Sequence, residues 1–160
     1  MPERLRKTLA DAISEVMETM FFLCPEPCQA ENGGAGKQGG EEPGGAQVIV
    51  QIRAADERLF RIVLKVPSAL LRIMAANVLD GPQEERTRKD LEDDMACELA
   101  NMVAGAFLNR LDEPRRKPLS IPAILAAVPA GEWMSYSCEV EGERLTGLVS
   151  CRCPEKGAAG

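Results

Sequence analysis

The chain has 160 residues, a net charge of −6 at pH 7 and 45% hydrophobic residues, a composition that fits one globular domain. This acidic balance excludes nucleic acid as a main partner, because no basic stripe is present to displace the counterions of phosphate groups. No apolar run reaches the roughly 20 residues that span a bilayer, and the N-terminal segment turns acidic where a signal peptide would be apolar. The sequence therefore predicts a cytoplasmic protein without a membrane partner.

The chain contains six cysteines and no histidine, and both counts limit its chemistry. Without histidine, the chain cannot build a Ser-His-Asp or Cys-His catalytic group of its own. Cys24 and Cys28 form one pair and Cys151 and Cys153 another, so four thiolates could in principle hold zinc. Their spacing is not that of two-residue zinc knuckles at both ends, so reduced structural thiols are the favoured interpretation. We therefore expect no bound metal.

The N-terminal part of the chain predicts a helix followed by a loop. In residues 4–23 apolar side chains recur at helical spacing, and Pro25 and Pro27 are expected to end that helix. Residues 29–46 are rich in glycine and in polar side chains and cannot bury a core. We expect them to form a flexible loop.

A hairpin and a second helix are expected next. Residues 47–54 and 58–66 alternate apolar and polar side chains, which is typical of two strands joined by a short connection. Pro67 and Ser68 then open a helix that is expected to continue through Leu79, before the turn signal Asp-Gly-Pro.

Residues 87–111 predict one long amphipathic helix. Its apolar side chains recur every three or four residues and are expected to be buried: Leu91, Met95, Leu99, Met102 and Ala106. A polar stripe follows the same spacing beside the apolar one: Asp94, Glu98, Asn101 and Gly105. Its carboxylates and its carboxamide would lie at the edge of the buried face, where the helix holds them in place and a partner molecule can still contact them. From spacing alone, an ordinary solvated helix face is the commoner explanation of such a stripe.

The C-terminal part of the chain predicts short strands. Residues 119–125 form an apolar run interrupted by Pro122, which indicates an edge strand or an extended segment. Residues 132–140 and 144–153 predict a second hairpin, and residues 155–160 a frayed tail. Helices that precede antiparallel hairpins favour an α+β fold, with a mostly antiparallel sheet packed under long helices and a loose internal duplication.

The polar stripe of the long helix resembles a family motif. Asp94, Glu98 and Asn101 follow the pattern of an acidic residue, three residues, glutamate, two residues and asparagine, and Pro122 stands further along the chain. Together with the apolar residues between Glu98 and Gly105, this pattern is similar to that of the chemotaxis phosphatase family CheC/CheX/FliY. The resemblance implies a CheC-like fold.

The resemblance covers nearly the whole chain and implies a single CheX-like domain over residues 1–154, assembled as a homodimer. Some members of the family carry a second glutamate and asparagine on the first helix. Here no asparagine stands three residues after Glu15 or Glu18, so the resemblance implies one site per chain.

The implied activity is hydrolysis of the phosphorylated aspartate of a CheY-like receiver domain. Glu98 and Asn101 would be the catalytic residues, with Glu98 docking on a lysine of the receiver and Asn101 holding the attacking water. Asp94 and Gly105 would contact the partner. The chain would need no cofactor of its own, because the receiver would supply Mg²⁺.

Two alternatives from another functional class stay open at this point. The same fold can serve as a non-catalytic receiver-binding or flagellar-switch module, as in the middle domain of FliM, where Glu98 and Asn101 would be docking contacts only. The chain could also be a purely structural partner-binding domain. Turnover of a phosphorylated receiver separates the enzyme from both alternatives.

Overall fold

The structure is a computed structural model, and it describes residues 2–28, 46–55, 59–78, 88–111 and 119–152. Within these ranges the elements follow one another along the chain as α1 (Pro2–Met20), β1 (Glu26–Pro27), β2 (Gln47–Ala55), β3 (Leu59–Pro67), α2 (Ser68–Val78), α3 (Arg88–Arg110), β4 (Ala123–Leu125), β5 (Met134–Val140) and β6 (Glu143–Arg152). The expected Gly-rich loop, apart from Ala46, and the tail 155–160 lie outside the described residues, as does Cys153.

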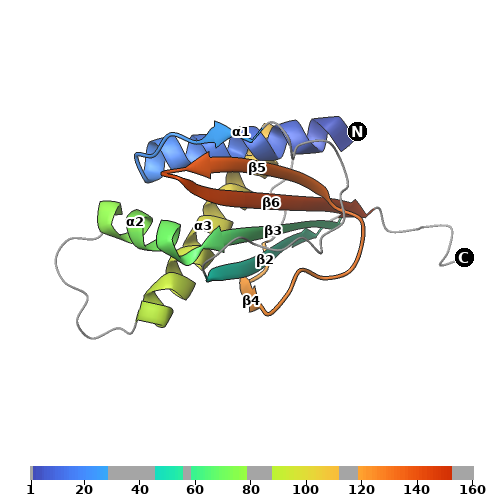
Figure 1. The fold of residues 1–160 in the computed structure, drawn as a ribbon. Coiled ribbons are helices and arrows are strands. Elements are labelled where there is room, and N and C mark those ends of the chain that lie inside the picture. The colour runs from blue at the N-terminus through green and yellow to red at the C-terminus, as the bar shows by residue number, and fades with distance from the viewer. Residues whose placement is uncertain (1, 29–45, 56–58, 79–87, 112–118, 153–160) are drawn as a thin grey trace, which may run out of the picture.

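All strands join one six-stranded antiparallel sheet in the order β1-β5-β6-β3-β2-β4. Helices α1 and α3 pack side by side over one face, α1 on β5 and β6, and α3 on β2 and β3 (Figure 1). Helix α2 continues directly from the end of β3 and also packs on α3. The expected α+β fold, with long helices over an antiparallel sheet, is confirmed.

The strand order reveals how the two halves of the chain are related. Each half gives a helix, a short strand and a hairpin, and the two hairpins meet where β3 pairs with β6. Each short strand crosses to pair with the hairpin of the other half, β1 with β5 and β4 with β2. Sequence reasoning noticed the duplication only loosely, because it missed β1, whose two residues are too short for any alternation.

Alternation along β2 and β3 places the core on the helical face of the sheet. Val50, Ile52, Ile62 and Leu64 are buried there, as their spacing predicted. The opposite face carries a second, smaller cluster, in which Ile49 and Val63 pack with Trp133 and Leu148.

The indole of Trp133 anchors this second cluster. Its Nε1 donates a hydrogen bond to the carbonyl oxygen of Pro129 at 3.0 Å. The guanidinium of Arg61 lies 4.7 Å from the ring centroid, in the range of a cation–π contact. Val63 stands at one of the positions of β3 where the predicted alternation expects a polar side chain, and it is apolar and buried because Trp133, in the segment before β5, packs on it.

Helix α1 ends earlier than the proline signal predicted. It stops at Met20, where the amide of Leu23 donates to the carbonyl oxygen of Met17 at 2.9 Å and Phe22 adopts a left-handed conformation with φ of 59°. These are the features of a Schellman cap, which normally places glycine at this position. The predicted end at residue 23 is therefore wrong, because the cap, and not Pro25, ends the helix.

Gly147 of β6 permits the close approach of α1 to the sheet. A Cβ built at this position would lie 2.9 Å from Ile13 Cδ1 and 3.1 Å from Leu9 Cδ2. Both side chains are completely buried and cannot swing away. We expect Gly147→Ala to lower the free energy of unfolding by about 1–3 kcal/mol, the usual cost of overpacking. Urea denaturation followed by circular dichroism measures this, and an unchanged midpoint would show that α1 can shift without cost.

Two titratable groups under α1 should make the fold sensitive to alkaline pH. Burial, followed by the charge of Cys28, raises the pKa of the Cys138 thiol to about 12. Burial is also the main cause that raises the pKa of Tyr136 to about 12. Between pH 9 and 12 the unfolded chain releases protons that the folded chain retains, so stability falls as the pH rises.

We expect a thermal midpoint that is constant up to about pH 9 and then declines. The loss is at most about 1.4 kcal/mol per pH unit for each group. Cys138→Ala should make the decline shallower, because it removes one of the two groups. A decline that begins well below pH 9, or one that Cys138→Ala leaves unchanged, would contradict this cause.

Candidate functional site

The site lies on α3, and the burial of this helix largely follows the sequence pattern. Met95, Leu99 and Ala106 are buried as predicted. Leu91 and Met102 were also expected in the core, but both are only half-buried. The buried face is centred on Leu99 and continues through neighbouring side chains that the stripe did not include: Ala96, Ala100, Val103 and Phe107. The predicted polar stripe is nevertheless correctly placed at the edge of this face.

Asp94, Glu98 and Asn101 form an exposed ridge along α3, and Gly105 continues it as a half-buried position. Residues three or four apart on a helix have Cβ atoms about 5–6 Å from each other, so the carboxylate of Glu98 and the amide of Asn101 can meet the same small group. Within the part of the chain that the structure describes, neither side chain forms a hydrogen bond or an ion pair. Both are therefore available to a partner.

Gly105 leaves open space one turn beyond Asn101. A Cβ built there would have no atom of its surroundings within 4 Å. Glycine inside a helix costs about 0.5–1 kcal/mol relative to alanine, and packing within the chain does not require it here. The space would allow another surface to approach α3 closely.

An open groove of about 360 Å³ runs beside the ridge. Its walls come from the ends of three helices: Met20 and Phe21 from the end of α1, Val78 from the end of α2, and Leu91, Asp94, Met95, Glu98 and Met102 from α3. Leu91 and Met102 are half-buried because they line this groove. Among the described residues that line it, only Asp94 and Glu98 are charged. Sequence reasoning missed the groove because its residues are distant along the chain.

Two polar contacts hold the walls of the groove together. Asn77 Nδ2 donates to the carbonyl oxygen of Phe21 at 2.8 Å, which joins the end of α2 to the end of α1. Arg72 Nη1 donates to Glu92 Oε2 at 3.1 Å, which joins α2 to α3. Glu92 is only 5% exposed, so this pair is shielded on the carboxylate side and fixes the first turns of the site helix.

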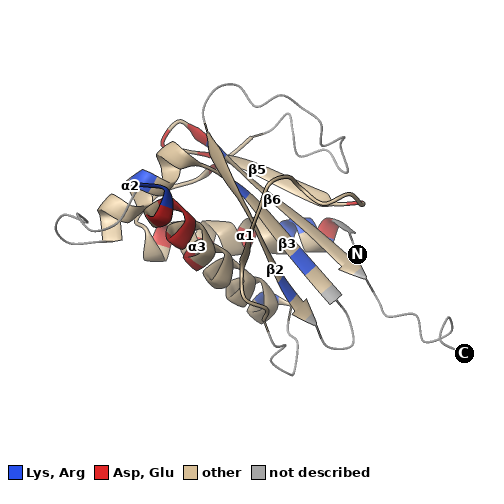
Figure 2. Ribbon diagram, turned by 90° about the horizontal axis from the view of Figure 1, so that it is seen from below, with Lys and Arg blue, Asp and Glu red and all other residues tan. Residues whose placement is uncertain are grey.

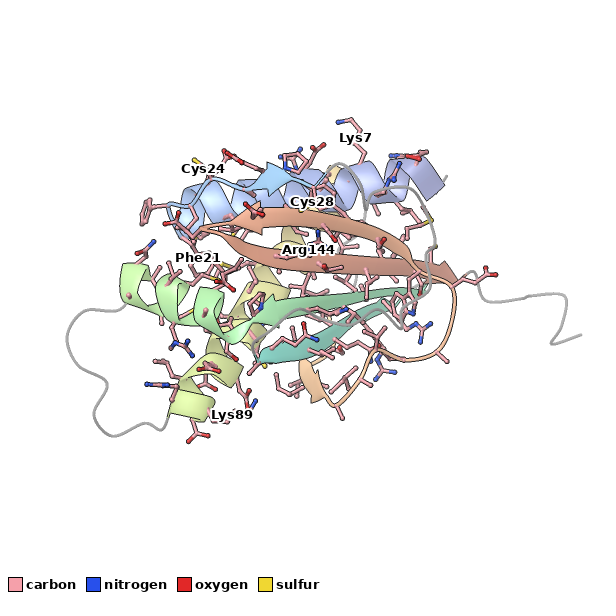
Figure 3. The ribbon with its side chains drawn as sticks, viewed as in Figure 1. Lys7, Phe21, Cys24, Cys28, Lys89 and Arg144 are labelled. Atoms are coloured by element: carbon pink, nitrogen blue, oxygen red, sulfur yellow. The ribbon has the colours of Figure 1, made fainter. Side chains whose placement is uncertain are left out.

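Three large apolar side chains are exposed at the ends of α1 and α2 or directly after them. Phe22 is 73% exposed, Met20 48% and Val78 41%. Phe21, which precedes Phe22, is buried and lines the groove together with Met20 and Val78 (Figure 3). The left-handed conformation of Phe22 costs roughly 1–2 kcal/mol for an L-residue. The chain therefore accepts backbone strain at a residue whose aromatic ring is exposed to solvent.

Acidic residues gather on one half of α3, and basic residues lie both beside them and on the strands. Figure 2 shows the acidic residues on the half of α3 that lies next to α2, with basic residues at the same end and others along β2 and β3. Beside the acidic residues, Arg72 of α2 pairs with Glu92 and Lys89 of α3 pairs with Asp93. The described lining of the groove nevertheless carries acidic charge, from Asp94 and Glu98.

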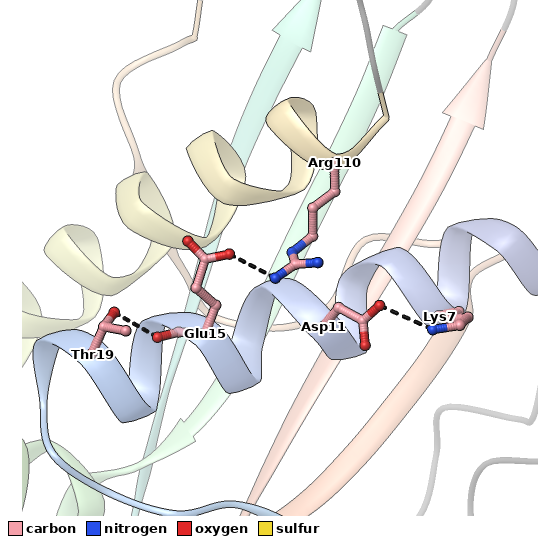
Figure 4. Close-up of polar contacts among 5 residues, drawn as sticks. All are labelled: Lys7, Asp11, Glu15, Thr19 and Arg110. Atoms are coloured by element: carbon pink, nitrogen blue, oxygen red, sulfur yellow. Dashed lines mark hydrogen bonds and ion pairs between the residues drawn. The ribbon is translucent and has the colours of Figure 1, made fainter.

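The first helix offers no second copy of the ridge. Glu15 Oε1 accepts a hydrogen bond from Arg110 Nη2 at 2.8 Å, in an ion pair between α1 and α3 (Figure 4). Lys7 and Asp11 form a second pair along α1 at 3.1 Å, and the Thr19 hydroxyl bonds to the carbonyl oxygen of Glu15 at 2.6 Å. The carboxylate of Glu15 is thus engaged by its own chain.

Comparison with protein families places this geometry in context. Residues 48–131, more than half of the chain, match the family described as chemotaxis phosphatase CheX. The chain belongs to the CheX family. The matched region contains the whole ridge of α3 and Pro122, whereas α1 lies before it. The resemblance expected from the sequence is confirmed.

Solved CheX structures share the fold at low sequence identity. The chemotaxis protein CheX from Vibrio vulnificus superposes with a TM-score of 0.69 at 12% identity, over 95% of this chain and 99% of that one. A chain in the CheX–CheY–BeF₃–Mg²⁺ complex from Borrelia burgdorferi gives a TM-score of 0.58 at 20% identity, over 91% of this chain and 96% of that one. A match in the FliM–SpeE complex from H. pylori gives 0.61 at 10% identity, over 94% and 85%. The search of curated proteins found no match.

Within the described ranges, which do not include Cys153, no three side chains of His, Cys, Asp or Glu are grouped so that they could hold an ion. No helix in those ranges is long and apolar enough to cross a membrane.

Proposed function

We propose that the chain hydrolyses the phosphorylated aspartate of a CheY-like receiver domain. The observation that carries the proposal is the exposed and unengaged Glu98–Asn101 pair, one turn apart on a helix that is fixed at both ends. Membership of a chemotaxis phosphatase family supports the reaction class. The chain from Borrelia burgdorferi that is bound to CheY, BeF₃ and Mg²⁺ supports the kind of partner.

In this mechanism the chain positions the attacking water, and the receiver carries the phosphoryl group that the water attacks. Phosphoryl transfer passes through a loose transition state that needs an in-line water and little covalent chemistry from the protein. The Asn101 amide can accept a hydrogen bond from a water and donate one to a phosphoryl oxygen, so it can fix the water in line. A new bond forms between the water oxygen and phosphorus, and the bond between phosphorus and the aspartate oxygen breaks. Inorganic phosphate is released, and the receiver's aspartate is left as a free carboxylate.

Glu98 would act as the docking residue. Its carboxylate stands one turn from Asn101 and can pair with a lysine beside the phosphorylated aspartate. Asp94, one turn further from Asn101, would add negative charge at the interface, and Gly105 would give the space for close approach. The magnesium that neutralises the phosphoryl group would come from the receiver, which the Mg²⁺-containing CheX–CheY complex supports.

The rival function is a receiver-binding or flagellar-switch module without turnover, and the fold match in the FliM–SpeE complex keeps it open. The presence of Asn101 favours hydrolysis over binding without turnover, because binding alone would not require an amide that can hold a water. The proposal further includes a cytoplasmic homodimer of a single CheX-like domain over residues 1–154. Sedimentation of the isolated chain tests the dimer.

Release of inorganic phosphate from a phosphorylated receiver tests the activity. The chain should accelerate release above the receiver's own rate, in proportion to its concentration at low occupancy. Binding to the same receiver without any acceleration would instead favour the rival module.

A further inference from the structure

We infer that Arg72 and Glu92 are positioning residues, whose ion pair holds the first half of α3 against α2 and so keeps Asp94 and Glu98 where the receiver docks. Neither member of the pair would touch the phosphoryl group, and both would act through the two carboxylates of the ridge. This inference rests on the proposed function and adds to it the contact that keeps the docking residues in place before the receiver binds.

Glu92 stands where an amphipathic helix would normally have an apolar side chain. Residues 88–90 of α3 are exposed and Leu91 is half-buried, so Glu92, at 5% exposed, is the first buried residue of the helix. It is also the only charged residue among the buried ones in the described ranges. Burying a carboxylate is costly unless it is paired, and its Oε2 accepts a hydrogen bond from Arg72 Nη1 at 3.1 Å.

The pair connects α3 to a helix that is itself anchored. Helix α2 continues directly from β3, and the bond from Asn77 Nδ2 to the carbonyl oxygen of Phe21 fixes its far end on α1. The first turns of α3 extend beyond the strands of the sheet and lie beside α2 (Figure 1). Helix α2 is therefore their support, and the pair sets how they lie on it.

The place of the pair along α3 determines which ridge residues depend on it. Asp94 and Glu98 follow Glu92 by about 3 and 9 Å along the helix axis. Asn101 is further away and comes directly after Ala100, which is completely buried in the core. A displacement of the first turns would therefore move the docking carboxylates more than the amide that holds the water. The pair should affect docking of the receiver and not the hydrolytic step.

Stability alone does not explain an ion pair at this place. Well-packed apolar side chains of similar size in place of a buried ion pair often leave a protein equally stable or make it more stable. Apolar contacts have no direction, however, and two helices joined only by them can shift against each other. A hydrogen bond with a preferred length and angle limits that shift. The pair thus fits a role in geometry better than a role in stability.

The test replaces the pair with two apolar side chains. Arg72→Met/Glu92→Met keeps the net charge and good helix formers, so the thermal midpoint should stay at or above that of the wild type. The concentration of the chain that gives half of the maximal acceleration of phosphate release should rise about tenfold, because the docking carboxylates must then become ordered on binding. The maximal rate should not change, and both chains are compared well below their thermal midpoints, where they are folded.

Lys89→Met/Asp93→Met is the matched control. This ion pair, at 2.8 Å, lies on the same turns but joins α3 only to itself, so its loss should leave the half-saturating concentration unchanged. Arg72→Lys is the conservative variant. Because Arg72 donates to Glu92 through one nitrogen and not through a bidentate pair, lysine can replace it. Arg72→Lys should therefore retain a half-saturating concentration close to that of the wild type.

A half-saturating concentration that Arg72→Met/Glu92→Met leaves at the wild-type value would overturn the inference and leave the proposed function intact. An equal rise in Lys89→Met/Asp93→Met or in Arg72→Lys would also overturn it. If the wild type binds the receiver loaded with beryllofluoride, a stable mimic of the phosphoryl group, but does not accelerate phosphate release, the proposed function fails. A weaker dissociation constant of Arg72→Met/Glu92→Met for that receiver would then still support positioning of the ridge by the pair.

Discussion

Replacing Asn101 with alanine should abolish the acceleration of receiver dephosphorylation and leave receiver binding largely intact. The amide acts on a water and not mainly on the partner, so its loss affects the transition state more than the complex. Removing one positioned polar group of this kind typically costs about 10²–10³ in rate. Stability should change by less than about 1 kcal/mol, because Asn101 is exposed and unengaged within the described structure.

Asn109→Ala is the control for this prediction. It makes the same chemical change at an exposed position on the same helix, two turns further on, and should retain the wild-type rate. Full acceleration by Asn101→Ala in stopped-flow decay of the phosphorylated receiver would show that another group positions the water.

Reversing the charge of Glu98 should instead weaken docking. Glu98→Lys replaces a charge-assisted contact, worth roughly 1.5–3 kcal/mol, with repulsion from the partner lysine. The dissociation constant for the beryllofluoride-loaded receiver should therefore rise by about ten- to a hundredfold. Glu98→Ala should show the same direction with a smaller effect. In the wild type, added salt should reduce affinity, because the contact lies at an exposed ridge.

Glu139→Lys provides the matched control for net charge. It is exposed on β5, which lies at the other side of the sheet, next to β1, and it changes the total charge by the same amount. If Glu139→Lys and Glu98→Lys weaken binding equally, general electrostatic attraction and not a contact at Glu98 would explain the effect.

The long helix shows how far the sequence could predict the site. Its period placed Leu99 in the core and Glu98 and Asn101 beside it, because a single amphipathic helix on a sheet has only one way to bury its apolar stripe. The error at Met102 has a physical cause. The buried face is wider than the stripe of large side chains and includes small residues such as Ala96 and Ala100, whose burial depends on how closely α1 approaches.

The features that the sequence did not predict all depend on contacts between distant segments. The Arg72–Glu92 pair joins residues on two helices, and nothing in a charge pattern distinguishes a buried glutamate from its exposed neighbours. The groove likewise needs the ends of three helices. The end of α1 was also missed, because Pro25 and Pro27 gave a simple reason for the helix to continue to residue 23. Nothing in the local sequence marks Phe22 as the residue with a left-handed conformation, since glycine is the usual residue there.

Catalysis by the ridge of α3 should be visible in the decay of a phosphorylated receiver. The receiver is phosphorylated, mixed with increasing concentrations of the wild-type chain in the presence of Mg²⁺, and followed by stopped-flow fluorescence. We expect the decay rate constant to rise with the concentration of the wild-type chain and to saturate, while Asn101→Ala leaves it at the receiver's own value at every concentration. A rate constant that stays flat for the wild type, at concentrations where binding is complete, would contradict catalysis by the ridge.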